Sequence, residues 1–117
     1  MTFLRGAAVA LVLAASATAS EAAETVTGRW ALNESACASW FGTGAQSALI
    51  VSETSLRWSS DACRIERTYK AGDTVHIQAL CWGDAGEKSI PVSLRPRGGR
   101  LAVTWDRGAR GEFKRCP

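Results

Sequence analysis

The sequence predicts a small all-β protein: an antiparallel meander of seven or eight short strands that forms a barrel or a sandwich. Three observations indicate this class. Short apolar or alternating runs recur along the chain, separated by turn-forming residues. Helix signals after the N-terminal segment are weak, apart from one short helix after the first strand. Four cysteines can supply two disulfides to a domain whose core buries only a modest area.

The first 22 residues have the build of a secretory signal peptide. Met1–Arg5 carries one positive charge, Gly6–Ala15 is apolar, and the small residues that follow predict cleavage after Ala19 or Ala22. The alternative, a membrane anchor, needs ~20 apolar residues, and this run is about half as long. We therefore expect a periplasmic or secreted protein, without stable membrane insertion after cleavage, whose single β domain covers residues 23–117.

The first part of that domain predicts three strands and the short helix. The strands are expected over Thr25–Leu32, Ala48–Ser52 and Leu56–Ser59. Asn33 is a favourable N-cap for a short helix through Cys37 to Trp40, and Glu34 suits its first turn. The glycines of Gly42-Thr43-Gly44 are expected to end this helix.

The next two strands, Cys63–Lys70 and Thr74–Trp82, predict a hairpin with the three-residue loop Ala71-Gly72-Asp73. This register places Tyr69 opposite Val75, Ile65 opposite Ala79 and Cys63 opposite Cys81. Val75, Ile77, Ala79 and Cys81 then share the inner face, while Thr74, His76 and Gln78 take the outer one. The same register puts Arg67 on the inner face, where a charged side chain fits poorly.

The four cysteines predict two disulfides, because their number is even and the chain is exported. A structural zinc site would need close pairs of cysteines, whereas the separations here are 26, 18 and 35 residues. Directly opposed residues have Cβ atoms ~4.5–5.5 Å apart, which small adjustments bring within disulfide range. We therefore predict Cys63–Cys81, and Cys37–Cys116 follows by elimination.

A second hairpin is predicted from Ile90–Arg95 and Arg100–Asp106, joined by Pro96-Arg97-Gly98-Gly99. In this register Leu94 meets Leu101, Val92 meets Val103 and Ile90 meets Trp105. All three matches are apolar, so the register is internally consistent. Phe113–Cys116 is expected to add a last short strand.

Short sequence features resemble known groups of exported proteins. The first strand begins with Gly28-x-Trp30, as lipocalin-like barrels often do, and small Cys-bridged periplasmic inhibitor proteins are similar at the same level. More broadly, the chain resembles small uncharacterised secreted bacterial proteins with a G-x-W start, C-x-I and A-x-C strands and an R-C-P end. The matching positions are Gly28/Trp30, Cys63/Ile65, Ala79/Cys81 and Arg115-Cys116-Pro117. The resemblance implies no biochemical activity.

Basic residues gather in the C-terminal third. Lys88–Pro117 contains eight basic and two acidic residues, whereas Glu21–Glu87 contains five basic and nine acidic ones. Such an end can attract an acidic protein surface, a phosphate or another anionic component of the cell envelope. The alternative is a solvated face that keeps the protein soluble. Nucleic acid is not expected as a partner, because the chain is exported.

Sequence motifs of enzymes are missing. The sequence has no G-x-S-x-G, H-E-x-x-H, phosphate-binding loop or dinucleotide fingerprint. His76, the only histidine, falls on the polar face of its strand, and pairing of all four cysteines leaves no free thiol. Nothing singles out a catalytic pair among the carboxylates of Asp61, Glu66, Asp73 and Asp84. We therefore expect a protein that is not an enzyme and uses no cofactor or metal.

Exposed tryptophan and arginine side chains are the candidate partner-binding residues, since both types anchor protein interfaces and can stack on sugar rings. Of the five tryptophans, Trp30 and Trp105 fit a core role, whereas Trp82 points away from the inward set and Trp58 lies beside an arginine. The alternative is that Trp58 and Trp82 pack under loops. Basic loops at Arg97–Arg100 and Arg107–Gly111 either hold an anion or are plain turns. The predicted site comprises Arg57, Trp58, Trp82, Arg97 and Arg100.

Together these features predict an exported, monomeric, non-enzymatic binding protein. The most specific version of this hypothesis is an inhibitor-like module whose disulfide-held loops place arginine and tryptophan side chains in the cleft of a hydrolase. The basic C-terminal third would then speed the association of the two proteins by electrostatic attraction. Two alternatives stay open. One is a carrier of a small apolar ligand in a barrel cavity, and the other is an envelope structural or stress protein without a discrete site.

Overall fold

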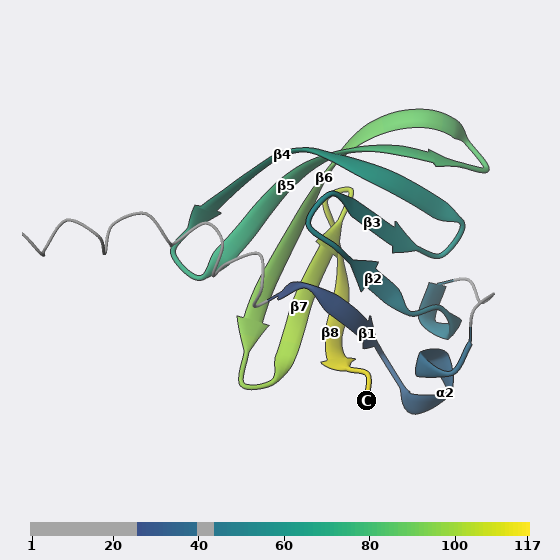
Figure 1. Cartoon of the computed structure of the whole chain (residues 1–117), viewed down its shortest axis with the longest axis vertical. Coiled ribbons are helices and arrows are strands. Elements are labelled where there is room, and N and C mark those ends of the chain that lie inside the picture. Colours follow the sequence, from purple (N-terminus) through teal and green to yellow (C-terminus); the bar gives the residue numbers. More distant parts are fainter. Residues whose placement is uncertain (1–25, 40–43) are drawn as a thin grey trace, which may run out of the picture.

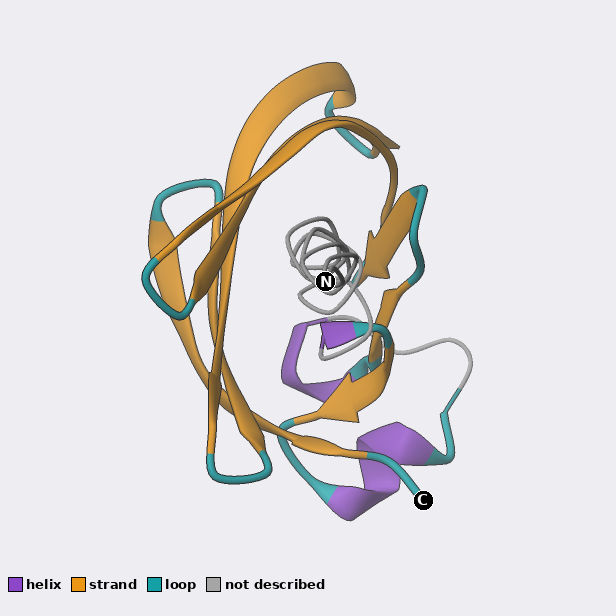
Figure 2. Cartoon of the chain, turned by 60° about the vertical axis from the view of Figure 1, so that its left-hand side comes forward, coloured by secondary structure: helices purple, strands orange, loops and turns teal. Residues whose placement is uncertain are grey.

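The computed structural model of the chain describes residues 26–39 and 44–117. The predicted signal peptide and Trp40 lie outside these residues. Eight antiparallel strands follow one another in sequence order and close into a barrel through the pairing of the first with the last (Figure 1). The predicted all-β meander is confirmed, and it is a barrel rather than a sandwich. Seen from another side, the strands form a ring around the interior (Figure 2).

The elements have the following bounds. The strands are β1 (Gly28–Ala31), β2 (Leu49–Val51), β3 (Ser55–Trp58), β4 (Asp61–Ala71), β5 (Thr74–Gly83), β6 (Gly86–Arg97), β7 (Arg100–Trp105) and β8 (Gly108–Arg115). The helices are α2 (Glu34–Cys37) and the 3₁₀ turn η2 (Gly44–Gln46). No helix in the described ranges is long and apolar enough to cross a membrane.

Alternation along the strands fills the barrel interior. On β5 the predicted inner residues are buried. On β6 from Ile90 to Leu94, and on β7 from Leu101 to Trp105, every second residue is apolar and buried. Trp30 and Trp105 lie in this core, as predicted. The core cluster also includes Leu49, Val51, Leu56, Val75, Ile77, Ile90, Val92, Leu94, Leu101, Val103 and Phe113.

The β4–β5 hairpin confirms part of the predicted register and corrects the rest. Cys63 pairs with Cys81 and Ile65 with Ala79, but a β-bulge follows Ile65 and leaves Glu66 without a partner. Tyr69 therefore lies opposite His76 and not opposite Val75. The bulge moves Arg67 to the outer face, opposite Gln78, which removes the unfavourable inward charge. The loop shortens to Gly72-Asp73, with Gly72 at φ +62°.

The β6–β7 register differs from the prediction by two residues. Val92 pairs with Trp105 and Leu94 with Val103, so the predicted matches to Val103 and Leu101 are wrong. The strands run on to Arg97 and Arg100, and only Gly98-Gly99 forms the loop. Both glycines have positive φ, +54° and +84°, as a two-residue type I′ turn requires. Because the shift is even, every side chain keeps its predicted face.

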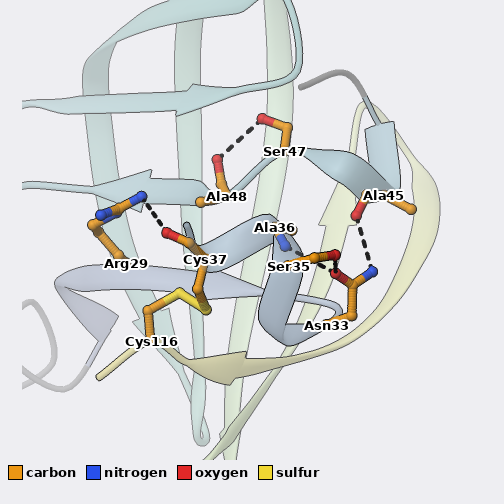
Figure 3. Close-up of a disulfide and its surroundings, with 9 residues drawn as sticks. All are labelled: Arg29, Asn33, Ser35, Ala36, Cys37, Ala45, Ser47, Ala48 and Cys116. Atoms are coloured by element: carbon orange, nitrogen blue, oxygen red, sulfur yellow. Dashed lines mark hydrogen bonds between the residues drawn. A yellow bond between two sulfur atoms is a disulfide. The ribbon is translucent and has the colours of Figure 1, made fainter. Parts of the chain in front are cut away.

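Both predicted disulfides are present, Cys37–Cys116 and Cys63–Cys81. The first joins the end of α2 to the residue after β8 (Figure 3). Asn33 caps α2 as predicted, and its Oδ1 accepts a hydrogen bond from the Ala36 N–H at 2.9 Å. The helix ends at Cys37, whose carbonyl oxygen accepts a hydrogen bond from Arg29 Nη2 at 2.8 Å.

The G-x-W start of the first strand has a structural cause. Gly28 has φ +141°, and a Cβ atom there would lie 2.6 Å from Nη1 of Arg115. Arg115 donates a hydrogen bond from this nitrogen to the Thr27 carbonyl oxygen at 2.9 Å. Its guanidinium carbon also lies 4.1 Å from the centroid of the Trp30 ring. Glycine is therefore needed for both its backbone freedom and its lack of a side chain.

Candidate functional site

The five predicted site residues lie in three separate places. Arg57 and Trp82 are exposed on the outer face of the sheet, whereas Trp58 is buried inside the barrel. Arg97 and Arg100 pair with each other at the tip of the β6–β7 hairpin. The β6 residue next to Trp82 is ten positions before Arg97, a path of ~33 Å along an extended strand. The structure thus brings Arg57 and Trp82 together and leaves the basic tip apart.

The outer face of β3, β4 and β5 carries an exposed tryptophan between arginines. Arg57 pairs with Ala62, and Ala62 pairs with Trp82, so the three residues form one row across the strands. Trp82 is 44% exposed, and the small Ala62 leaves the space between the two larger side chains open. The Arg64 guanidinium carbon lies 5.9 Å from the Trp82 ring centroid. We call the surface formed by Arg57, Ala62, Arg64 and Trp82 the Trp82 face.

A disulfide lies directly beneath the Trp82 face. Ala62 precedes Cys63 and Trp82 follows Cys81, and the two cysteines are paired and bonded. The two strands are therefore cross-linked one residue from the row that carries the tryptophan. Such a surface changes little on binding, which lowers the entropy that association costs.

Charges on the Trp82 face are of mixed sign. Arg64 lies 3.6 Å from Glu66, but both side chains are largely exposed, so this ion pair contributes little. Glu87 pairs with Trp82 across β5 and β6. Among the residues that the structure describes, Arg57 has no ion-pair partner within 4.0 Å. Its guanidinium is therefore available to a carboxylate of another molecule.

The Trp58 side chain packs in the barrel core and belongs to the main hydrophobic cluster, a placement that neither expectation for it had specified. It is 8% exposed, and its ring centroid lies 5.4 Å from that of Trp105 and 6.2 Å from that of Phe113. Both contacts are edge-to-face, a favourable geometry for aromatic rings. The expectation that Trp58 presents its ring to a protein partner is corrected by this burial. On β3 both Leu56 and Trp58 point inward and Arg57 points outward.

Carboxylates engage two arginines at the basic hairpin end. Arg97 lies 3.7 Å from Glu112, and Arg95 lies 3.3 Å from Asp73. Desolvation acts to raise the pKa of the Asp73 carboxyl, but the charge and hydrogen bond of Arg95 together with hydrogen bonds from the Asp73 backbone and the Thr74 hydroxyl lower that pKa. Arg100 instead pairs across the sheet with Lys114, which keeps this part of the surface positive.

Sequence reasoning missed an exposed aromatic pair on the outer face. Tyr69 is 59% exposed and stacks on His76, with ring centroids 5.0 Å apart and an interplanar angle of 17°. His76 Nδ1 lies 3.3 Å from the Ser93 hydroxyl oxygen. The β-bulge after Ile65 creates the pair, because the regular register turns Tyr69 inward. The misplaced charge of Arg67 in that register was the signal of a bulge.

The chain was compared with protein-family models, with curated proteins and with solved structures, and none of the three comparisons finds a match. Within residues 26–39 and 44–117, no group of three or more His, Cys, Asp and Glu side chains is placed to hold a metal ion. All four cysteines are in disulfides.

Proposed function

We propose that this chain is an exported, non-enzymatic binding protein that recognises a protein partner through the Trp82 face. The observation that carries this proposal is the exposure of Trp82 on a disulfide-braced sheet, next to Arg57 and Arg64. Tryptophan and arginine are the residue types most enriched among side chains that dominate binding energy. An exposed tryptophan beside an arginine that is unpaired among the described residues therefore has the composition of an interface hot spot.

The chemistry of the Trp82 face defines the partner that would fit it. The Trp82 indole would fit into an apolar recess of the partner, and the Arg57 guanidinium would form an ion pair with a carboxylate at the edge of that recess. In the inhibitor-like form of the proposal, the recess is the cleft of a hydrolase. The basic C-terminal third then accelerates encounter with an acidic partner, without forming the centre of the interface.

The two disulfides support the exported location in this proposal. Two disulfides are typical of proteins in an oxidising, extracytoplasmic environment. A periplasmic or secreted location, with residues 1–22 removed as a signal peptide, is part of the proposal. The partner is accordingly sought in the cell envelope or outside the cell.

The first experiment identifies the partner by native mass spectrometry. The protein is purified gently from its own exported fraction and measured under native and denaturing conditions. Additional native mass of the size of a protein is the expected result. Additional mass of a few hundred daltons would favour the carrier alternative, and bare protein would favour a structural role without a discrete site.

The second experiment tests the Trp82 face with the captured partner. We expect Trp82→Ala to weaken binding about 30-fold, since ~2 kcal/mol is the usual threshold for an interface hot spot. Tyr69→Ala is the matched control, because it removes an aromatic ring of β4 that is more exposed than Trp82 and lies outside the Trp82 face. Arg97→Ala tests the basic tip separately. Unchanged affinity in both Trp82→Ala and Arg57→Ala would refute the proposed surface.

A further inference from the structure

A pocket of about 350 Å³ lies at one end of the barrel. The β3–β4 turn, the β5–β6 hairpin and the β7–β8 turn contribute to it, and the β5–β6 hairpin arches over the top of the molecule in Figure 1. We call it the mouth pocket. Its volume is at the lower end of the range of small-molecule sites, ~300–1,000 Å³. The Trp82 side chain is not part of its lining.

Two tryptophans form the deep wall of the mouth pocket. The Trp58 and Trp105 rings meet edge to face, 5.4 Å apart at an interplanar angle of 60°. Cys81 and Ile90 extend this wall, and all four residues are buried. The wall is therefore aromatic and apolar, which favours a flat apolar ligand.

The rim of the mouth pocket is polar, and its charges balance. Lys88 forms an ion pair with Asp106 at 2.9 Å. Arg110 donates a hydrogen bond to the Trp105 carbonyl oxygen at 3.1 Å, and its guanidinium carbon lies 5.7 Å from the Trp58 ring centroid. Asp61 supplies the remaining charge of the rim. Two positive and two negative side chains favour a neutral ligand over an ion.

The indole nitrogen of one lining residue, Trp58, lacks a hydrogen-bond partner within the described part of the chain. The Trp58 indole Nε1 is buried and has no acceptor among the residues that the structure describes. The Trp30 indole, equally part of the core, donates to the Val26 carbonyl oxygen at 2.9 Å. More than about 90% of buried polar groups in folded proteins have a partner. Trp58 therefore offers a hydrogen-bond donor that the protein itself does not use.

We propose that the mouth pocket binds a small, neutral aromatic molecule whose hydrogen-bond acceptor takes the Trp58 indole N–H. A cavity of ~150 Å³ holds one benzene ring, so the mouth pocket has room for two fused rings. Because the N–H is covered in the free protein, binding includes a shift of rim side chains. The exposed Arg110 lies over the indole and is placed to make this shift. The site is independent of the partner proposed for the Trp82 face.

Coumarin is a suitable probe, because it has two fused rings, no charge and a carbonyl acceptor. Naphthalene is its matched control, with the same ring frame and no acceptor. The exported protein is labelled with ¹⁵N and titrated with each compound while the indole N–H resonances are recorded. We expect coumarin to move the Trp58 resonance downfield in a saturable manner and to leave Trp30 nearly unchanged, since Trp30 already donates a hydrogen bond.

The variant Trp58→Phe separates the hydrogen bond from the apolar contact, because it keeps an aromatic ring and removes the donor. It should weaken coumarin binding about fivefold, since one neutral hydrogen bond contributes ~1 kcal/mol, and change naphthalene binding less than about twofold. The wild-type titration tests the site even where this variant fails to fold. A titration without a saturable Trp58 shift, or with a shift at Trp82 alone, overturns the proposal. Equal coumarin affinity of wild type and Trp58→Phe overturns it as well.

Discussion

At the scale of single residues, the tryptophans show how well the sequence predicts which side chains face the barrel interior and which face outward. Sequence alternation indicated that Trp105 lies inside and Trp82 outside, because each lies on a strand with enough apolar neighbours to define a face; Trp30 was assigned to the core only as a large apolar residue of a small domain. Trp58 was harder to place, since β3 has four residues and offers little alternation to read. The sequence did not indicate the partner of either buried indole N–H: Trp30 donates to the Val26 carbonyl oxygen, four residues before it, and Trp58 has no partner among the described residues.

Gly28 leads to a prediction at the same scale. We expect Gly28→Ala to lower the free energy of unfolding by about 1–3 kcal/mol, from backbone strain and from displacement of Arg115. Urea denaturation of the purified variant measures this change. Gly44→Ala is the control, because Gly44 also has a positive φ, +54°, but nothing lies within 4 Å of the added Cβ. Equal losses in the two variants would show that the contact with Arg115 contributes nothing.

At the scale of elements, the sequence predicted correctly that β4 pairs with β5 and β6 with β7, but it predicted their registers only in part. The number of residues in each loop sets the register, and turn chemistry sets that number. Gly98-Gly99 supplies both positive φ angles of a two-residue turn, so the strands extend further than the apolar matches alone indicated. The only sign of the bulge at Glu66 in the sequence was that a regular register turned the charged Arg67 inward.

Deletion of Glu66 tests whether this residue is merely extra in the β4–β5 ladder. Without it, Arg67 still lies opposite Gln78, so we expect a regular hairpin that keeps the Tyr69–His76 stack. The upfield shift of the His76 ring protons, caused by Tyr69, reports the stack by NMR. Tyr69→Leu is the control, because it keeps the length of β4 and removes the ring that causes the shift. Loss of the shift on deletion of Glu66 would show that the bulge itself positions the two rings.

At the scale of the whole molecule, local sequence patterns could not predict that the sheet closes into a barrel. The barrel closes through pairing of β1 with β8, which are separated by most of the domain, and only two residue pairs define this seam: Trp30 with Arg115 and Ala31 with Lys114. The backbone N–H of Cys116 adds a hydrogen bond to the Arg29 carbonyl oxygen at 2.8 Å. The predicted Cys37–Cys116 bond was the one long-range clue to closure.

The two disulfides should contribute unequally to stability. By loop entropy, a separation of 79 residues for Cys37–Cys116 corresponds to about 4.5 kcal/mol, and a separation of 18 for Cys63–Cys81 to about 3 kcal/mol. We therefore expect the Cys37→Ala/Cys116→Ala variant to lose more unfolding free energy in urea than Cys63→Ala/Cys81→Ala. The opposite order would mean that native contacts near Cys63–Cys81 outweigh the entropy of the longer loop.

The short seam between β1 and β8 also governs how copies of the protein behave toward one another. A sheet with open edges presents unpaired N–H and C=O groups that can template pairing with another chain. In this barrel the two-pair seam between β1 and β8 is fastened by Cys37–Cys116, so an oxidising environment keeps both of these strands paired. Reduction of that bond would free them together and favour strand exchange between neighbouring molecules. The Cys37–Cys116 disulfide thus opposes self-association as well as joining α2 to the residue after β8.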